Sequence, residues 1–248
     1  IEVKTREKVI AFTGDLGRLD PLILKPPEFI RKADYLITES TYGDTLHSPL
    51  SPLKDLARVV SKTADRKGHV IIPAFAVGRT QDLLFLLSTL KRQSQIPDIP
   101  IFLDTPMGIN ATEIFLDYPQ GHRLSPDEVH RLSRSAILVK SQQQSDELLD
   151  RKDSSIVIAG SGMLTGGRIL THLMKRLPDD RNSVVLLGYQ ADGTRGRYLK
   201  SGVRDLKIYG QYVPVRAQIV EISTLSAHAD QKDLLQWMKN FDAPPQKV

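Results

Sequence analysis

The stretch Val70-Ile71-Ile72-Pro73-Ala74-Phe75-Ala76-Val77-Gly78-Arg79-Thr80-Gln81 decides the fold of this chain. Its apolar first half has the unbroken hydrophobicity of a strand that is buried on both faces. A helix pattern follows over residues 79–93, with leucines between Leu83 and Leu90 on its inner face. A buried strand that leads directly into a helix is the repeating unit of parallel sheets covered by helices.

The same alternation continues along most of the chain. Helix patterns begin at Ser51-Pro52, with Ser51 as N-cap, and recur near residues 111–118, 145–151 and 167–177. Apolar runs predict strands at residues 8–12, 35–38, 101–103, 136–139, 155–159 and 184–188. We therefore expect an α/β fold whose sheet is mostly parallel and flanked by helices.

The pattern changes near the C-terminus. Residues 206–223 alternate polar and apolar side chains, which predicts an antiparallel hairpin or an edge pair of strands. Asp230 then has the position of an N-cap for a last helix, and Ala243-Pro244-Pro245 ends that helix. Near the start, residues 47–52 are the best candidate for a linker.

Composition limits the chemistry that the chain can perform. The 248 residues contain no cysteine, so disulfides and thiolate metal sites are excluded and any zinc must use histidine and carboxylate ligands. A formal charge of +5 favours a polyanionic partner, although many proteins without such a partner are equally basic. No apolar run is long enough to cross a membrane and no signal peptide is visible, so we expect a cytoplasmic protein.

An aspartate follows the first apolar run. In Phe12-Thr13-Gly14-Asp15-Leu16-Gly17-Arg18, Asp15 stands on a Gly-containing turn at the end of the strand, where ligands bind in open α/β sheets. Its carboxylate has two oxygens and could bridge two divalent ions. Taken alone, such an aspartate is more often a turn or capping residue.

Two further candidates are Glu39 and His228. Glu39 ends the next apolar run, in Glu39-Ser40-Thr41-Tyr42-Gly43, and could orient a histidine or simply be solvated. His228 lies in Ser226-Ala227-His228-Ala229-Asp230, flanked by small residues that would let a substrate approach. The other five histidines show no i, i+2 or i, i+4 pairing and are interpreted as structural or surface residues.

Three Gly-rich junctions follow apolar runs and could bind phosphate through backbone amides or arginine. They are residues 73–81, 159–168 and 188–197, and their candidate substrate contacts are Arg79, Ser161, Gly162 and Arg197. Each junction alone is weak evidence, because glycine after a strand is usually a steric requirement.

The junction at residue 160 has two other possible interpretations. Its glycine spacing resembles a dinucleotide fingerprint with one extra residue, but Asp192 lies about thirty residues on rather than about twenty. A serine-hydrolase elbow would need glycine where Ala159 and Met163 stand.

Together, the Gly-Asp turn, the Glu-Ser-Thr-Tyr-Gly and Ser-Ala-His motifs and the three junctions resemble the metallo-β-lactamase-fold nucleases that carry a β-CASP domain. The resemblance covers essentially the whole chain. It implies an RNA-processing hydrolase with two zinc ions, acting on single-stranded RNA. It further implies that Asp15 bridges the metals, that Glu39 orients His228, and that His228 protonates the leaving group.

The chain departs from that family in one respect. The His-x-His-x-Asp-His zinc cluster of the family does not occur in the sequence, and the chain does not begin with methionine. We therefore expect a partial chain with weak zinc binding and little nuclease activity of its own. A non-catalytic RNA-binding or scaffold subunit of the same fold is the alternative.

The resemblance also divides the chain. Residues 1–43 and 227–248 would be parts of an αββα metallo-β-lactamase domain, and residues 44–226 would be the inserted β-CASP domain. The sequence leaves open whether the protein forms a homo-oligomer.

Overall fold

The computed structural model describes residues 1–48 and 51–248, so part of the expected linker at residues 47–52 lies outside the described residues. The chain forms two compact units. Unit 1 comprises Ile1–Pro49 and Ser226–Val248, and unit 2 comprises Leu50–Leu225. Unit 2 is therefore one continuous segment inserted into unit 1.

Unit 2 is built on a six-stranded sheet in which all neighbouring strands are parallel. This confirms the expected α/β class and its mostly parallel sheet. In spatial order the strands are β11 (Gln218–Ile222), β8 (Ser183–Leu187), β4 (Val70–Pro73), β7 (Ile156–Ala159), β5 (Ile101–Asp104) and β6 (Ile137–Leu138).

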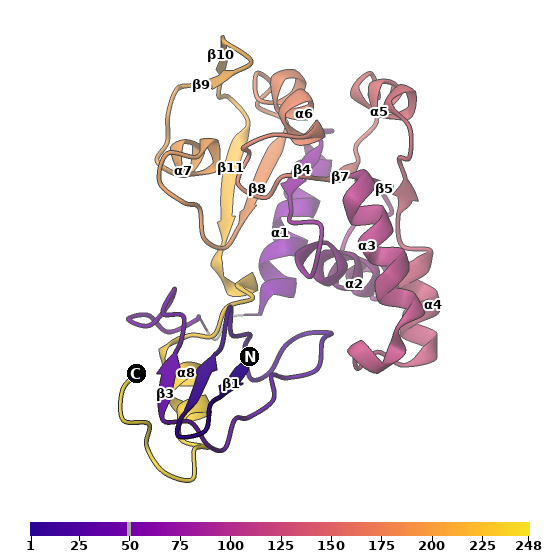
Figure 1. Cartoon of the computed structure of the whole chain (residues 1–248). Coiled ribbons are helices and arrows are strands. Elements are labelled where there is room, and N and C mark those ends of the chain that lie inside the picture. Colours follow the sequence, from indigo (N-terminus) through magenta and orange to yellow (C-terminus); the bar gives the residue numbers. More distant parts are fainter. Residues whose placement is uncertain (49–50) are drawn as a thin grey trace. The chain divides into compact units, whose positions relative to one another are not determined.

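Helices flank this sheet (Figure 1). One core cluster joins Ile71, Val157 and Val184 of the sheet to leucines of three helices, α5 (Gln142–Leu149), α6 (Arg168–Arg176) and α7 (Arg195–Lys200). Four other helices contact one another and contribute no residue to this cluster: α1 (Pro52–Asp65), α2 (Arg79–Arg92), α3 (Pro106–Asp117) and α4 (Pro126–Ser133).

A hairpin of β9 (Asp205–Ile208) and β10 (Gln211–Pro214) packs on the same cluster through Leu206, Ile208 and Val213. The antiparallel hairpin expected near residues 206–223 is confirmed. The later part of that stretch differs, because β11 is a parallel edge strand of the main sheet. The elements β1, α4 and α7 were not predicted from the sequence.

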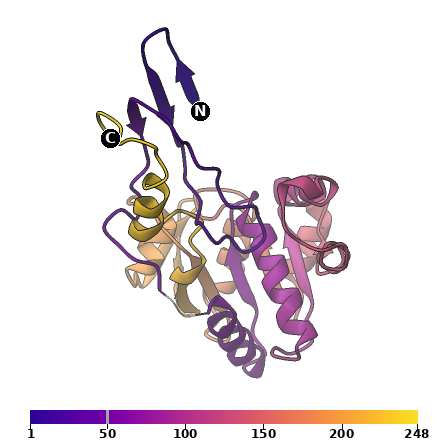
Figure 2. The same cartoon turned by 90° about the horizontal axis from the view of Figure 1, so that it is seen from below.

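The described residues of unit 1 form a three-stranded sheet and one α-helix. Figure 2 shows these elements from a second direction. Strand β2 (Val9–Phe12) lies between β1 (Glu2–Lys4), which is antiparallel to it, and β3 (Tyr35–Ile37), which is parallel. The helix α8 (Gln231–Met238) packs Leu234 and Trp237 against this sheet. Asp230 caps it by accepting the backbone N–H of Asp233, as expected. No helix in the described residues combines the length and apolarity needed to cross a membrane.

Candidate active site

The parallel pairing of β2 and β3 brings Asp15 and Glu39 to the same edge of the unit 1 sheet. Phe12 lies opposite Ile37 in the register, so the segments that leave both strands begin side by side. Gly14 turns the first segment with a φ of +60°, which glycine adopts without steric cost. The next residue, Asp15, is exposed to solvent.

Glu39 is fixed from several directions. Its backbone N–H donates to the Thr13 hydroxyl at 3.3 Å, and the backbone N–H of Leu16 donates to its carboxylate oxygen Oε1. Its second oxygen, Oε2, lies 2.9 Å from Nδ1 of His228. Both carboxylate oxygens therefore already accept hydrogen bonds, as expected of a group that orients a histidine rather than of an open metal ligand.

His228 lies in the loop before α8 and is paired with the segment that carries Asp15. Gly17 and His228 form an antiparallel bridge, and the N–H of Ala229 donates to the Leu16 carbonyl at 2.7 Å. The His228 side chain is 30% exposed, against 8% for Glu39. The imidazole is therefore anchored at its base and open to solvent beyond it.

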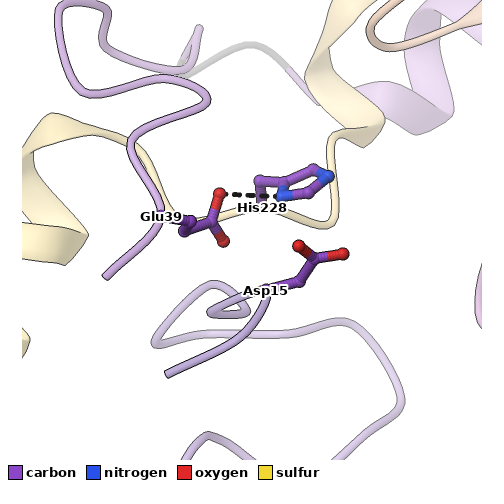
Figure 3. Close-up of side chains that lie close together, drawn as sticks. All are labelled: Asp15, Glu39 and His228. Carbon is purple, nitrogen blue, oxygen red and sulfur yellow. Dashed lines mark hydrogen bonds and ion pairs between the residues drawn. The ribbon is translucent and has the colours of Figure 1, made fainter. Parts of the chain in front are cut away.

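Figure 3 shows how the three side chains converge from separate segments. One ligand atom of each lies within 4.8 Å of the others. Because the carboxylate of Glu39 accepts, Nδ1 of His228 carries the proton in their contact, and Nε2 remains for another partner. The arrangement can hold an imidazole in one tautomer beside a free carboxylate.

The cluster fits part of a metal site. Asp15 offers an open carboxylate, but a catalytic zinc ion needs about three protein ligands besides water. Among residues 1–48 and 51–248, no other group of three or more ligating side chains comes together. The described residues thus offer one open carboxylate to a metal ion and do not complete the ligand set of a tight zinc site.

His47 was interpreted from the sequence as structural or surface, yet it contacts the site. Its Nε2 donates to the backbone carbonyl of His228 at 2.9 Å, and its backbone N–H donates to Asp230 at 2.9 Å. Burial alone would raise the pKa of Asp230, but the N–H groups of Asp233 and His47 hold that pKa below its ordinary value. No local sequence signal marks His47, because its partner lies 181 residues away.

The four candidate substrate contacts all belong to unit 2. Arg79 is the first residue of α2, and its largely buried side chain lies 3.4 Å from Asp82. Burial raises the pKa of Asp82 to about 6, against the opposing effect of Arg79. Arg197 is more exposed and pairs with Asp192 at 3.1 Å.

Ser161 and Gly162 shape the turn between β7 and α6. The Ser161 hydroxyl accepts the backbone N–H groups of Thr165 and Gly166 at 2.9 and 3.2 Å, so it holds its own loop together. Gly162 lies under the ring of Phe75, where an added Cβ would be 2.8 Å from Phe75 Cδ2. The close approach of the ring explains the need for glycine at position 162.

A buried polar network in unit 2 was not anticipated. Asp104, at the end of β5, is fully buried and accepts hydrogen bonds from Ser145, Arg168 and His172 at 2.6 to 2.7 Å. Burial alone would raise the pKa of Asp104, but these three donors hold it below its ordinary value. The network ties α5 and α6 to the sheet.

Two models of protein families match the sequence. The sequence model of the Beta-Casp domain matches residues 80–199. A second model, described as the Zn-dependent metallo-hydrolase RNA specificity domain, matches residues 212–248. The first match lies within unit 2, and the second runs from unit 2 into unit 1.

Several curated proteins are similar over nearly the whole chain. The chain is 35% identical over 242 residues to ribonuclease TTHA0252 of Thermus thermophilus, covering 94% of the chain and 55% of that protein. It is 33% identical over 248 residues to an RNase J-like protein of Methanocaldococcus jannaschii, covering 97% and 57%. It is 34% identical over 256 residues to transcription termination factor FttA of the same organism, covering 96% and 40%. The chain thus spans about half the length of the curated relatives it matches.

Proposed function

This chain belongs to the β-CASP family of metallo-β-lactamase-fold proteins, and we propose that it takes part in zinc-dependent hydrolysis of phosphodiester bonds in single-stranded RNA. The choice of RNA is supported by the relatives, which are named ribonuclease and RNase J-like protein. We expect the intact protein to be an RNA-processing nuclease that works in the cytoplasm.

The observation that carries the proposal is the contact between Glu39 and Nδ1 of His228 beside Asp15. Glu39 fixes the ring and stabilises the charged imidazolium, so that Nε2 can deliver a proton. Cleavage of a phosphodiester leaves an alkoxide oxygen that needs such a proton. His228 is therefore the general acid, and Glu39 is its positioning residue.

Asp15 would hold metal at this site. Its carboxylate is exposed and lies in the same cluster as His228, as a bridging ligand would. Two zinc ions, when bound, would supply a hydroxide nucleophile and neutralise phosphate charge. In unit 2, Arg79, Ser161, Gly162 and Arg197 are the proposed contacts to the RNA backbone.

We infer that these 248 residues, by themselves, bind zinc weakly and cleave RNA slowly. The sequence lacks a His-x-His pair, and the described cluster offers a single open carboxylate. Metal affinity rises with the number of preorganised ligands, so one aspartate holds an ion poorly. The remaining ligands would have to come from outside these 248 residues.

The test is RNA cleavage with added zinc by the longest form of the protein that its gene encodes. We expect His228→Ala to lower the cleavage rate by about 10²- to 10⁴-fold, the usual contribution of a general acid. His130→Ala, which removes an exposed histidine on α4, is the matched control and should cleave normally.

Two results would count against the proposal. Equal rates for wild type and His228→Ala would remove His228 from the mechanism. RNA binding without cleavage in either protein would instead favour the non-catalytic scaffold.

A further inference from the structure

The β9–β10 hairpin has one buried face and one aromatic, basic face. Leu206, Ile208 and Val213 point into the core, while Lys207 lies opposite Tyr212 on the outer face. Tyr212 is 70% exposed, and Lys207 Nζ lies 5.7 Å from the centre of its ring. The outer face thus presents a ring and a cation to solvent.

Tyr209 stands out in the turn that joins the two strands. Its φ is +48°, and that of the following Gly210 is +82°. Two residues with positive φ are typical of a type I′ hairpin turn, where asparagine and glycine are preferred and a tyrosine is strained. Tyr209 is also 61% exposed, so burial of the ring does not compensate for the strain.

Strand propensity can account for Tyr212, because tyrosine is common in strands. It cannot account for Tyr209, whose backbone conformation disfavours any large side chain. Strained residues of this kind are often retained where a function requires them. The position of the ring is therefore the feature that needs an explanation.

Charge concentrates in the same segment. Residues 195–216 contain six lysines and arginines against one aspartate, so their formal charge of +5 equals that of the whole chain. Arg197 and Lys200 pair with Asp192 and Glu221. In the part of the chain that the structure describes, no carboxylate lies within ion-pairing distance of the exposed side chains of Arg204, Lys207 and Arg216.

Arg195 adds to this positive surface from α7. Its guanidinium donates to the carbonyls of Lys207 and Leu164 at 2.8 and 3.2 Å, so hydrogen bonds fix it without neutralising its charge. Figure 1 shows α7 beside the hairpin in unit 2. The tyrosine rings and the basic side chains therefore lie on or beside two neighbouring elements, α7 and the β9–β10 hairpin.

We propose that the outer face of the hairpin, with Tyr209, Tyr212 and Lys207, binds single-stranded RNA together with the exposed arginines that flank its strands, Arg204 and Arg216. Bases would stack on the two tyrosines and the cations would contact phosphates, as in proteins that bind single strands without sequence preference. The choice of RNA rests on the proposed function, and the surface shares no residue with the Asp15–Glu39–His228 cluster.

Binding is measured with the whole chain in EDTA, so that no cleavage interferes. The probe is a fluorescein-labelled 12-nucleotide oligouridylate, compared with the same strand annealed to its complement. We expect the single strand to bind more tightly, because stacking needs unpaired bases. Equal affinity for strand and duplex would overturn the stacking model.

Substitutions separate binding from folding. Tyr209→Asn should weaken binding about fivefold or more, which corresponds to ~1 kcal/mol of lost stacking. Its melting temperature should stay equal or rise, because asparagine suits a positive φ. Tyr212→Thr, which keeps a strand-forming residue, should weaken binding similarly. Tyr118→Thr is the control, since Tyr118 is also exposed in unit 2 but lies outside the hairpin.

The charges are tested by salt dependence. Arg204→Gln and Lys207→Gln should each reduce the slope of log affinity against log salt by about 0.7, the value for one phosphate contact on a single strand. Lys152→Gln removes an exposed lysine elsewhere in unit 2 and should leave the slope unchanged. Unchanged binding in both tyrosine variants would overturn the proposal. It would also be overturned if the wild-type chain is a dimer in the absence of RNA and the tyrosine variants are monomers, because the tyrosines would then form a protein interface.

The binding experiments on the hairpin and the cleavage experiments on the proposed active site can fail independently of each other. Loss of cleavage by His228→Ala tests the active site, and loss of oligouridylate binding in EDTA by Tyr209→Asn and Tyr212→Thr tests the hairpin. If His228→Ala loses cleavage while the hairpin variants bind normally, only the hairpin proposal fails.

Discussion

At the scale of single residues, His228 is fixed at its ring by Glu39 and at its backbone by His47. The ring contact sets the tautomer, and the backbone contact sets the position from which the ring projects. The two partners come from either side of the Tyr42–Thr45 turn. As the proposed general acid, His228 must lie within hydrogen-bond reach of the leaving oxygen, so a small displacement of this backbone should cost activity.

We predict that His47→Ala lowers RNA cleavage by about 10- to 100-fold, as loss of an orienting partner usually does. His47→Gln should recover most of the rate, because the glutamine amide can donate to the His228 carbonyl from a similar position. The loss should appear in kcat rather than KM, since His47 acts on the acid and not on the RNA.

The measurement is steady-state cleavage by the three proteins, with melting temperatures recorded in parallel. Equal losses in both variants, accompanied by a lower melting temperature, would show that His47 only stabilises the fold.

At the scale of secondary structure elements, Asp104 joins the end of β5 to α5 and α6. Arg168 begins α6 and donates to Asp104 at 2.7 Å, and His172 donates one turn later at 2.7 Å. Ser145 of α5 donates to the same oxygen as His172. A buried carboxylate with three donors fixes the angle at which both helices meet the sheet.

We predict that Asp104→Asn destabilises the chain by about 3 kcal/mol at pH 7, because it leaves Arg168 without its charged partner in a largely buried site. The pKa of Asp104 is lowered in the fold. The contribution of its charge is therefore fully present above the unfolded pKa of about 4, and it is lost as the pH falls through the folded pKa.

Urea unfolding at pH 7, 5 and 3 would measure the difference between variant and wild type. That difference should be constant from pH 7 to 5 and should shrink at pH 3. Asp98→Asn is the control, because Asp98 pairs with Lys91 while almost fully exposed and should change stability little. A difference that grows towards low pH would contradict the assigned role.

Local sequence signals predicted most elements but few of the distant contacts. Asp230 could be identified as an N-cap because its partner, Asp233, is three residues away. The start of α4 carries an equally local signal, the capping box of Ser125 and Glu128. The contact of His47 with His228 and the network around Asp104 join segments far apart in the chain, so no local pattern announces them.

The candidate site was predictable for a different reason. Spacing alone left Asp15, Glu39 and His228 as ordinary turn and loop residues, and only their resemblance to a family linked them. The parallel register of β2 and β3 gives the physical basis for part of that link, since it aligns the segments that carry Asp15 and Glu39. His228 joins them through the bridge to Gly17.

At the scale of the whole molecule, the inserted segment separates the two halves of unit 1. The core cluster of unit 1 has seven buried residues, and three of them come from the C-terminal segment: Ala229, Leu234 and Trp237. The halves are joined at the point of insertion, where Gln231 donates to the Thr45 carbonyl at 3.1 Å. Residues 1–48 alone therefore lack almost half of the core that they need.

We predict that residues 1–48 are unfolded on their own, because their sheet cannot bury its apolar face without α8. Joining residues 1–48 to residues 226–248 by a short Gly/Ser linker should restore the fold, since Thr45 and Gln231 are already hydrogen-bonded. Amide NMR spectra of the two polypeptides would decide, with Trp237→Ala in the linked form as a control that should unfold it. A dispersed spectrum from residues 1–48 alone would contradict the prediction, and so would a poorly dispersed spectrum from the linked form. Either result would show that the core of unit 1 does not determine whether the site forms.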